Sequence, residues 1–129
     1  MSTTRLPIRT LSESNQRGLS RLAGILKSQR VRAQRKETYL HLLGTFGRRV
    51  PPLPLTITLT RVSPGTLDGD NLQHALKFCR DGVADWLALA YGKGNDAQEG
   101  LTWAYAQAKG GRGEYAVEVT ITRTPAPEG

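Results

Sequence analysis

The sequence lacks the features that define several broad classes of protein. Its 129 residues contain one cysteine, Cys79, which excludes an intrachain disulfide and a cysteine-rich zinc site. No apolar run approaches the roughly 18 residues that a membrane-spanning helix needs. The longest such run covers residues 86–91, and the first residues lack the apolar core of a secretion signal. We therefore expect a protein of the cytoplasm that has no membrane segment.

Acidic residues are scarce in the front part of the chain. Residues 1–50 hold eleven of the eighteen Lys and Arg side chains but only two of the eleven acids, Glu13 and Glu37. This segment therefore carries nine net positive charges, whereas residues 51–129 carry two net negative charges. Such an excess is larger than solubility requires and favours a polyanion as partner, most commonly a nucleic acid. The alternative is a helix whose cationic face is only solvated.

Apolar spacing in the front half predicts one short strand followed by helical structure. Residues 6–10 fit a short strand, and Pro7 favours a place at the edge of a sheet. Ser and Asn side chains at residues 12–15 can cap a helix that runs to about Gly44. Few apolar residues occupy the middle of this stretch, so it is either one helix or two helices that meet near residues 28–33.

The back half predicts strands around one amphipathic helix. Residues 53–62 alternate between apolar side chains and threonine, which is typical of a strand with one buried face, and residues 70–90 carry the strongest apolar stripe of a helix. Residues 101–107 and 115–121 also alternate, and the glycine-rich segment between them predicts a hairpin.

These elements predict a single domain that spans residues 1–129. Its basic front half covers residues 1–50, the strand, helix and hairpin cover residues 51–123, and residues 124–129 form a frayed tail. We expect a mixed α/β (α+β) fold, in which a small mixed sheet of about four strands has helices packed on it.

An acidic motif lies between the strand at 53–62 and the helix at 70–90. Asp68 and Asp70 are separated by Gly69, which lets the backbone turn sharply, and Asn71 follows. Asp70 or Asn71 can cap the helix. Two carboxylates at such a junction can aim at one point, so a metal site here would need a third ligand from elsewhere. Asp96, in the glycine-rich loop after the helix, is the first candidate, ahead of Glu99.

The same helix carries a polar face opposite its apolar stripe. Asp70, His74, Lys77, Asp81 and Asp85 fall within about 40° of one line along it. Asp70 and Asp81 are roughly 16 Å apart in helix rise, so one ion cannot contact both. A set of carboxylates with few histidines suits Mg²⁺ or Mn²⁺. The ordinary alternative is that these acids are cap and turn residues, and that His74 and Lys77 belong to a solvated face.

The residues around the acidic motif resemble those of a known family. Residues 68–72, Asp-Gly-Asp-Asn-Leu, and the helix through Asp85 resemble the RusA family of Holliday junction resolvases, in particular its phage and prophage members. The opening segment at 6–15 and residues 103–110 also match, so that the likeness covers residues 6–122. The resemblance implies a homodimeric, Mg²⁺-dependent endodeoxyribonuclease, with Mn²⁺ as an alternative metal. Its substrate would be branched DNA, resolved by symmetric nicking of four-way junctions in recombination and repair.

The resemblance also assigns roles to individual residues. It implies that the catalytic and metal-binding acids are Asp68, Asp70 and Asp96, and that Lys77 stabilises the charge of the reacting phosphate. The residues expected to hold DNA are Arg30, Arg32, Arg35, Lys36, Asn71 and His74. Two positions depart from the family pattern, because His74 replaces a lysine and Asn95 replaces an acid.

Two other functions stay open at this point. One is a non-catalytic DNA-binding protein that keeps the fold and the basic segment but has lost cleavage through Asn95 and His74. The other is an interaction subunit of a phage replication or recombination assembly.

Overall fold

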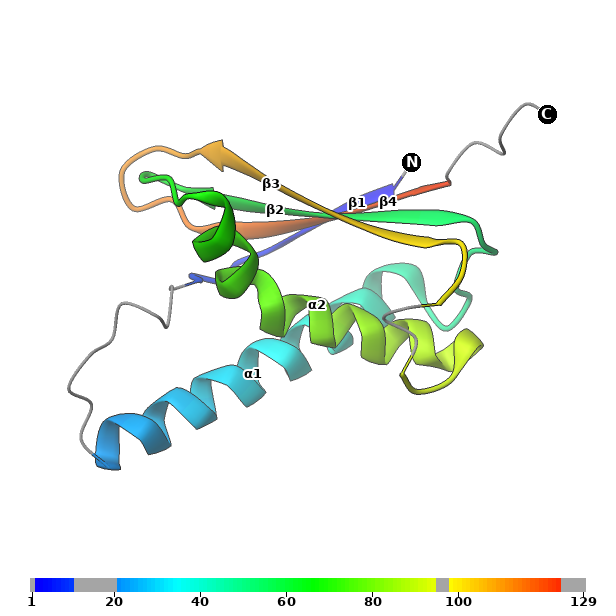
Figure 1. Ribbon diagram of the computed structural model, residues 1–129, viewed down its shortest axis with the longest axis horizontal. Helices are drawn as coiled ribbons and strands as arrows, with labels where there is room; N and C mark the ends of the chain where they lie inside the picture. The colour runs from blue at the N-terminus through cyan, green and yellow to red at the C-terminus, as the bar shows by residue number, and fades with distance from the viewer. Residues whose placement is uncertain (1, 11–20, 95–97, 124–129) are drawn as a thin grey trace.

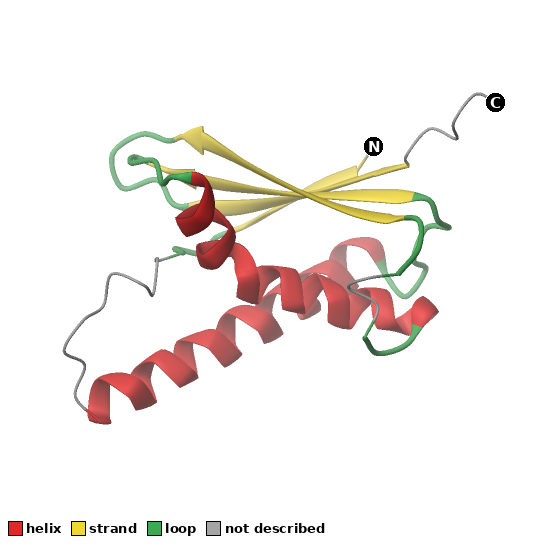
Figure 2. Cartoon of the chain, viewed as in Figure 1, coloured by secondary structure: helices red, strands yellow, loops and turns green. Residues whose placement is uncertain are grey.

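The computed structural model describes residues 2–10, 21–94 and 98–123. The elements in chain order are β1 (Ser2–Leu6), α1 (Arg21–Phe46), β2 (Leu55–Ser63), α2 (Gly69–Tyr91), β3 (Leu101–Lys109) and β4 (Ala116–Arg123). The four strands form one sheet, and both helices lie on the same side of it (Figures 1 and 2). The predicted mixed α/β fold, with a sheet of four strands and helices packed on it, is confirmed.

The order of the strands differs from the sequence-based expectation. The sheet has the order β1-β4-β2-β3, with β2 and β3 parallel and the other two pairs antiparallel. The predicted hairpin is therefore wrong, because β4 pairs with β2 and not with β3. Alternation shows which side chains of a strand are buried, but it does not select the neighbouring strand. The burial explains the order, since β4 has four buried residues and lies inside the sheet, whereas β3 has none and forms an edge.

The two N-terminal elements, β1 and α1, differ in part from those that the sequence predicts for residues 1–50. An edge strand is present, but it covers Ser2–Leu6 in place of residues 6–10. Over the described range α1 is one continuous helix, so the alternative of two helices that meet near residues 28–33 is wrong. Its middle packs through small polar groups: Thr38 is fully buried and donates a hydrogen bond of 2.7 Å to the carbonyl oxygen of Gln34. The expected helix start and the expected frayed tail lie outside the described residues.

The core lies between the sheet and α2. The buried side chains of α2 include the whole apolar stripe that the sequence predicts up to Leu87. Trp86 is fully buried, packs on Phe46 and donates its ring N–H to the carbonyl oxygen of Gly47 at 2.9 Å. Burial raises the pKa of Cys79 to about 11, so this thiol is an inert core group. Neither described helix has the length and apolar character needed to cross a bilayer.

The two helices approach each other closely at Gly82. A Cβ atom at this position would lie 2.5 Å from the carbonyl oxygen of Arg35 and 2.7 Å from the Cβ of Thr38. Both of these atoms belong to α1, and one is backbone, so neither can move aside easily. The absence of a side chain at Gly82 therefore sets the distance between the helices.

The replacement Gly82→Ala should destabilise the fold, because the added methyl group forces α1 away from α2. Overpacking of this kind typically costs about 1–3 kcal/mol. Gly44→Ala is the matched control, since it is also in a helix and its Cβ would meet nothing within 4 Å. Urea unfolding measures both changes, and equal stability of the two variants would contradict the close crossing.

Candidate functional site

The acidic motif forms the junction between β2 and α2. Asp68 is the N-cap residue of α2, and its Oδ1 accepts a hydrogen bond of 3.2 Å from the backbone N–H of Asn71. The sequence predicts the cap at Asp70 or Asn71, which is wrong because Gly69 already begins the helix. Asp70 therefore lies in the first turn. Both carboxylates are exposed, and one residue separates them.

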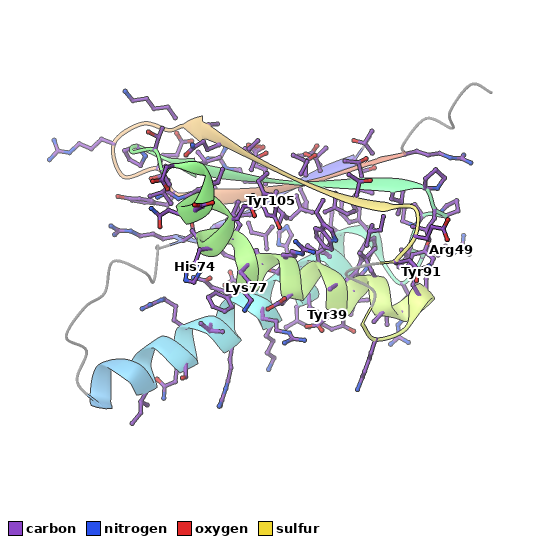
Figure 3. The ribbon with its side chains drawn as sticks, viewed as in Figure 1. Tyr39, Arg49, His74, Lys77, Tyr91 and Tyr105 are labelled. Carbon is purple, nitrogen blue, oxygen red and sulfur yellow. The ribbon has the colours of Figure 1, made fainter. Side chains whose placement is uncertain are left out.

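A hollow of about 390 Å³ follows this junction along the polar face of α2. The residues that line it are Asp70, Gln73, His74, Lys77, Arg80, Asp81 and Tyr105. All but Tyr105, which comes from β3, belong to α2. Figure 3 shows His74 and Lys77 near Tyr105 at one end of the helix, whereas Tyr91 and Arg49 lie at the other end. Three predicted site residues, Asp70, His74 and Lys77, are thus brought together.

Arg80 is held in place at the border of this hollow by two aromatic residues of β3. Its Nη1 donates a hydrogen bond of 2.6 Å to the hydroxyl of Tyr105, and its Cζ lies 4.5 Å from the ring centroid of Trp103. A guanidinium restrained by a hydrogen bond and a cation–π contact is ordered before any anion arrives. Arg80 is not among the site residues that the sequence predicts, although it follows Lys77 by three residues on the same helix face.

Two of the three predicted metal ligands lie within the described residues. Asp68 and Asp70 offer the hard oxygen donors that Mg²⁺ prefers. Nevertheless, within residues 2–10, 21–94 and 98–123 no group of three or more His, Cys, Asp or Glu side chains gathers where it could hold an ion. Asp96, the predicted third ligand, and its neighbour Asn95 lie outside the described residues.

The described chain on either side of Asp96 meets the end of α2 that is remote from the acidic motif. Gly92 caps the C-terminus of α2, and Leu101, which begins β3, pairs with the first residue of β2. The helix rise between Asp70 and Tyr91 is roughly 32 Å. The described residues that flank Asp96 thus meet the end of α2 opposite to Asp68 and Asp70.

The predicted DNA-binding residues of α1 do not line the hollow. Arg35 forms a two-bond ion pair with Asp85 of α2, at 2.7 Å from Nε and 2.8 Å from Nη2. Arg32 and Lys36 are exposed on α1, and Arg30 is half-buried. The basic surface and the hollow are thus built on different elements, and Arg35 also contributes to the contact between the two helices.

No family model matches the chain, and no curated protein matches its sequence.

The hydrogen bond of Asp68 gives it a structural role as the cap of α2. Asp68→Ala should lower the free energy of unfolding by about 1 kcal/mol, because the variant has no side-chain cap. Asp68→Asn should stay close to wild type, since its amide oxygen still accepts from the N–H of Asn71. Thermal unfolding followed by circular dichroism compares the variants, and an Asn variant as unstable as the Ala variant would contradict this capping role.

Proposed function

We propose that the protein is a Mg²⁺-dependent endodeoxyribonuclease that nicks branched DNA, with the four-way junction of recombination and repair as its substrate. The observation that carries the proposal is the hollow in which the carboxylate of Asp70 lies with His74, Lys77 and Arg80. Cleavage of a phosphodiester needs acids that hold a metal ion and cations that balance the charge of the phosphate. This hollow offers both kinds of group.

Each of these residues has a distinct role in the proposed reaction. Asp68 and Asp70 would hold the metal, because one or two carboxylates together with waters and a phosphate commonly suffice for Mg²⁺. Asp96, the third acid that the family resemblance implies, lies outside the described residues. Mn²⁺ would serve as an alternative to Mg²⁺. The bound ion supplies Lewis-acid activation of water and of the phosphate. Lys77 and the restrained Arg80 would neutralise charge on the phosphate oxygens, while His74 contacts the DNA strand beside them.

The basic surface of α1 would bind the DNA at a distance from the point of cleavage. The first turns of α1 extend beyond α2 and the sheet (Figure 1). Binding of backbone phosphates by Arg30, Arg32 and Lys36 gives affinity that depends strongly on salt and little on sequence. A homodimer would place one hollow on each of two DNA strands, in keeping with the near-two-fold symmetry of a four-way junction.

A second candidate is a DNA-binding protein that does not cleave. It is favoured by the position of the described residues on both sides of Asp96, which meet the end of α2 remote from Asp68 and Asp70. The two candidates predict the same binding but opposite results when metal is added.

A labelled four-way junction should be nicked at symmetric positions when Mg²⁺ is added to the wild-type protein. Asp70→Asn should abolish nicking but keep or tighten junction binding, because it removes a negative charge that repels the phosphates. Glu118→Gln on β4 is the matched control, since it removes the same charge outside the hollow, and it should nick at the wild-type rate. Denaturing gels measure cleavage, and native gels measure binding.

Two results would contradict the nuclease proposal. Absence of nicks between pH 6 and 9 with either Mg²⁺ or Mn²⁺, despite tight binding, would leave the non-cleaving candidate. Weaker junction binding by Asp70→Asn would show that this carboxylate does not face the DNA as proposed.

The double replacement Arg32→Glu and Lys36→Glu should weaken binding to duplex, forked and four-way DNA by the same factor. The slope of log affinity against log salt should also become shallower by about one for each phosphate that the variant no longer binds. Arg112→Glu, an exposed residue between β3 and β4, serves as control. Fluorescence anisotropy across a salt series gives both quantities, and weakening confined to junctions would show that these residues read DNA shape.

A further inference from the structure

A pocket that is separate from the hollow lies near the C-terminal end of α2. Its volume is about 330 Å³, which is at the lower end of the usual range for small-molecule sites. Residues of β1, α1, β2, α2 and β4 line it, together with the chain between α1 and β2. One of them, Arg49, lies in Figure 3 at the end of α2 opposite to His74 and Lys77. The pocket and the hollow share no residue.

The inner wall of this pocket is apolar. Leu55, Trp86 and Ile121 are buried there, and the half-buried ring of Phe46 packs on Trp86 with 5.8 Å between the ring centroids. The ring N–H of Trp86 is already bonded to the carbonyl oxygen of Gly47, so these side chains offer a ligand no polar partner. A polar group that enters would lose its hydrogen bonds with water and gain none. The inner part therefore suits a hydrocarbon body and disfavours a nucleobase.

The exposed rim of the pocket carries two arginine side chains. Arg49 comes from the chain after α1, and Arg123 is the last residue of β4. Arg123 pairs directly with the buried Leu55, so both side chains lie on the face of the sheet that the helices cover. No acid is among the described residues that line the pocket, and neither arginine has an ion-pair partner within residues 2–10, 21–94 and 98–123. The charge at the rim is thus complementary to an anion, and a guanidinium matches the geometry of a carboxylate.

Two hydrogen bonds fix the chain that carries Arg49. The ring N–H of Trp86 donates to the carbonyl oxygen of Gly47 at 2.9 Å, and the hydroxyl of Tyr91 donates to the carbonyl oxygen of Pro51. Because these two contacts lie on either side of Arg49 in the sequence, α2 holds the backbone before and after it. A wall that is ordered before a ligand arrives reduces the entropy lost on binding.

We infer that this pocket binds an organic anion in which an apolar body, about the size of one aromatic ring, carries a carboxylate. The body packs against Phe46 and Trp86, while the carboxylate accepts hydrogen bonds from Arg49 and Arg123 at the rim. Free carboxylic acids and the C-terminal residue of a polypeptide share this chemistry. The inference does not rest on the proposed nuclease function, because it uses none of the residues of the hollow.

The probe for the test is N-acetyl-L-phenylalanine, which joins an aromatic ring to a carboxylate. N-acetyl-L-phenylalaninamide lacks the charge, and N-acetylglycine lacks the ring. The variants Arg49→Gln and Arg123→Gln each remove one guanidinium. Arg48→Gln is the matched control, because Arg48 is exposed beside Arg49 but does not line the pocket. Titration calorimetry measures affinity, and nuclear magnetic resonance compares the indole N–H signals of Trp86 and Trp103, the two tryptophans of the chain.

Wild-type protein should bind N-acetyl-L-phenylalanine about 10-fold more tightly than either truncated compound, since each lacks one of the two kinds of contact. Arg49→Gln and Arg123→Gln should each weaken binding by about 10-fold, because a hydrogen bond to a charged group is lost. Arg48→Gln should match wild type. The indole signal of Trp86 should shift during the titration, and that of Trp103 should stay in place.

A further compound, 3-phenylpropionate, distinguishes the two sources of the ligand. It keeps the ring and the carboxylate but has no peptide group. Affinity equal to that of N-acetyl-L-phenylalanine would support the inference with a free acid as the ligand. Weaker binding of 3-phenylpropionate would support it with the C-terminal residue of a polypeptide.

Three results would overturn the inference. Equal affinity for the acid and its amide would show that the pocket does not recognise an anion. Equal loss of affinity in the Arg48 and Arg49 variants would show that only the overall positive charge matters. A Trp86 signal that stays in place while the probe binds, or tighter binding of thymidine monophosphate than of the probe, would contradict the apolar pocket as the site of a carboxylate. None of these measurements involves DNA cleavage, so the proposed function is tested separately.

Discussion

The parallel pairing of β2 with β3 is the constraint on which the rest of the site depends. Two adjacent parallel strands need a crossover, and α2 provides it by running back along the sheet. The loop after β2 and the last residues of β3 consequently meet at the same end of these two strands. Gln107 therefore lies beside the loop that precedes α2, and Tyr105 contacts Arg80 in the middle of the helix. The same constraint directs the chain after α2 to the opposite end of the two strands. The described residues on both sides of Asp96 are therefore remote from Asp68.

The contact between the helices determines how α1 is presented. At Gly82 the two helices come close enough that no side chain fits between them, and the ion pair of Arg35 with Asp85 fastens the same crossing. The cost of ordering this exposed pair limits what it adds to stability, so the close packing matters more. Because α1 is anchored in this part of the helix, its first turns are left to extend beyond α2 with their positive charge (Figure 1).

The side-chain patterns predict where the helices and strands lie better than they predict which strands pair with each other. The threonine alternation in β2 and the apolar stripe of α2 each follow from one local period, so they identify a strand and a helix without knowledge of the fold. The pairing of β4 with β2 depends on whether β3 or β4 buries more surface. The pattern of a single strand does not reveal this. The contacts of Gln107 with Leu67 and of Arg80 with Trp103 join residues that are 40 and 23 positions apart, and only the strand register brings them together.

The most direct test of a metal site at the start of α2 is nuclear magnetic resonance during a Mn²⁺ titration, because this paramagnetic ion broadens signals from nuclei close to it. With substoichiometric Mn²⁺ the amide signals of residues 67–74 should broaden first, and those of residues 28–40 in α1 should keep their intensity. Broadening that begins elsewhere, or that is uniform over the chain, would contradict a metal site at Asp68 and Asp70.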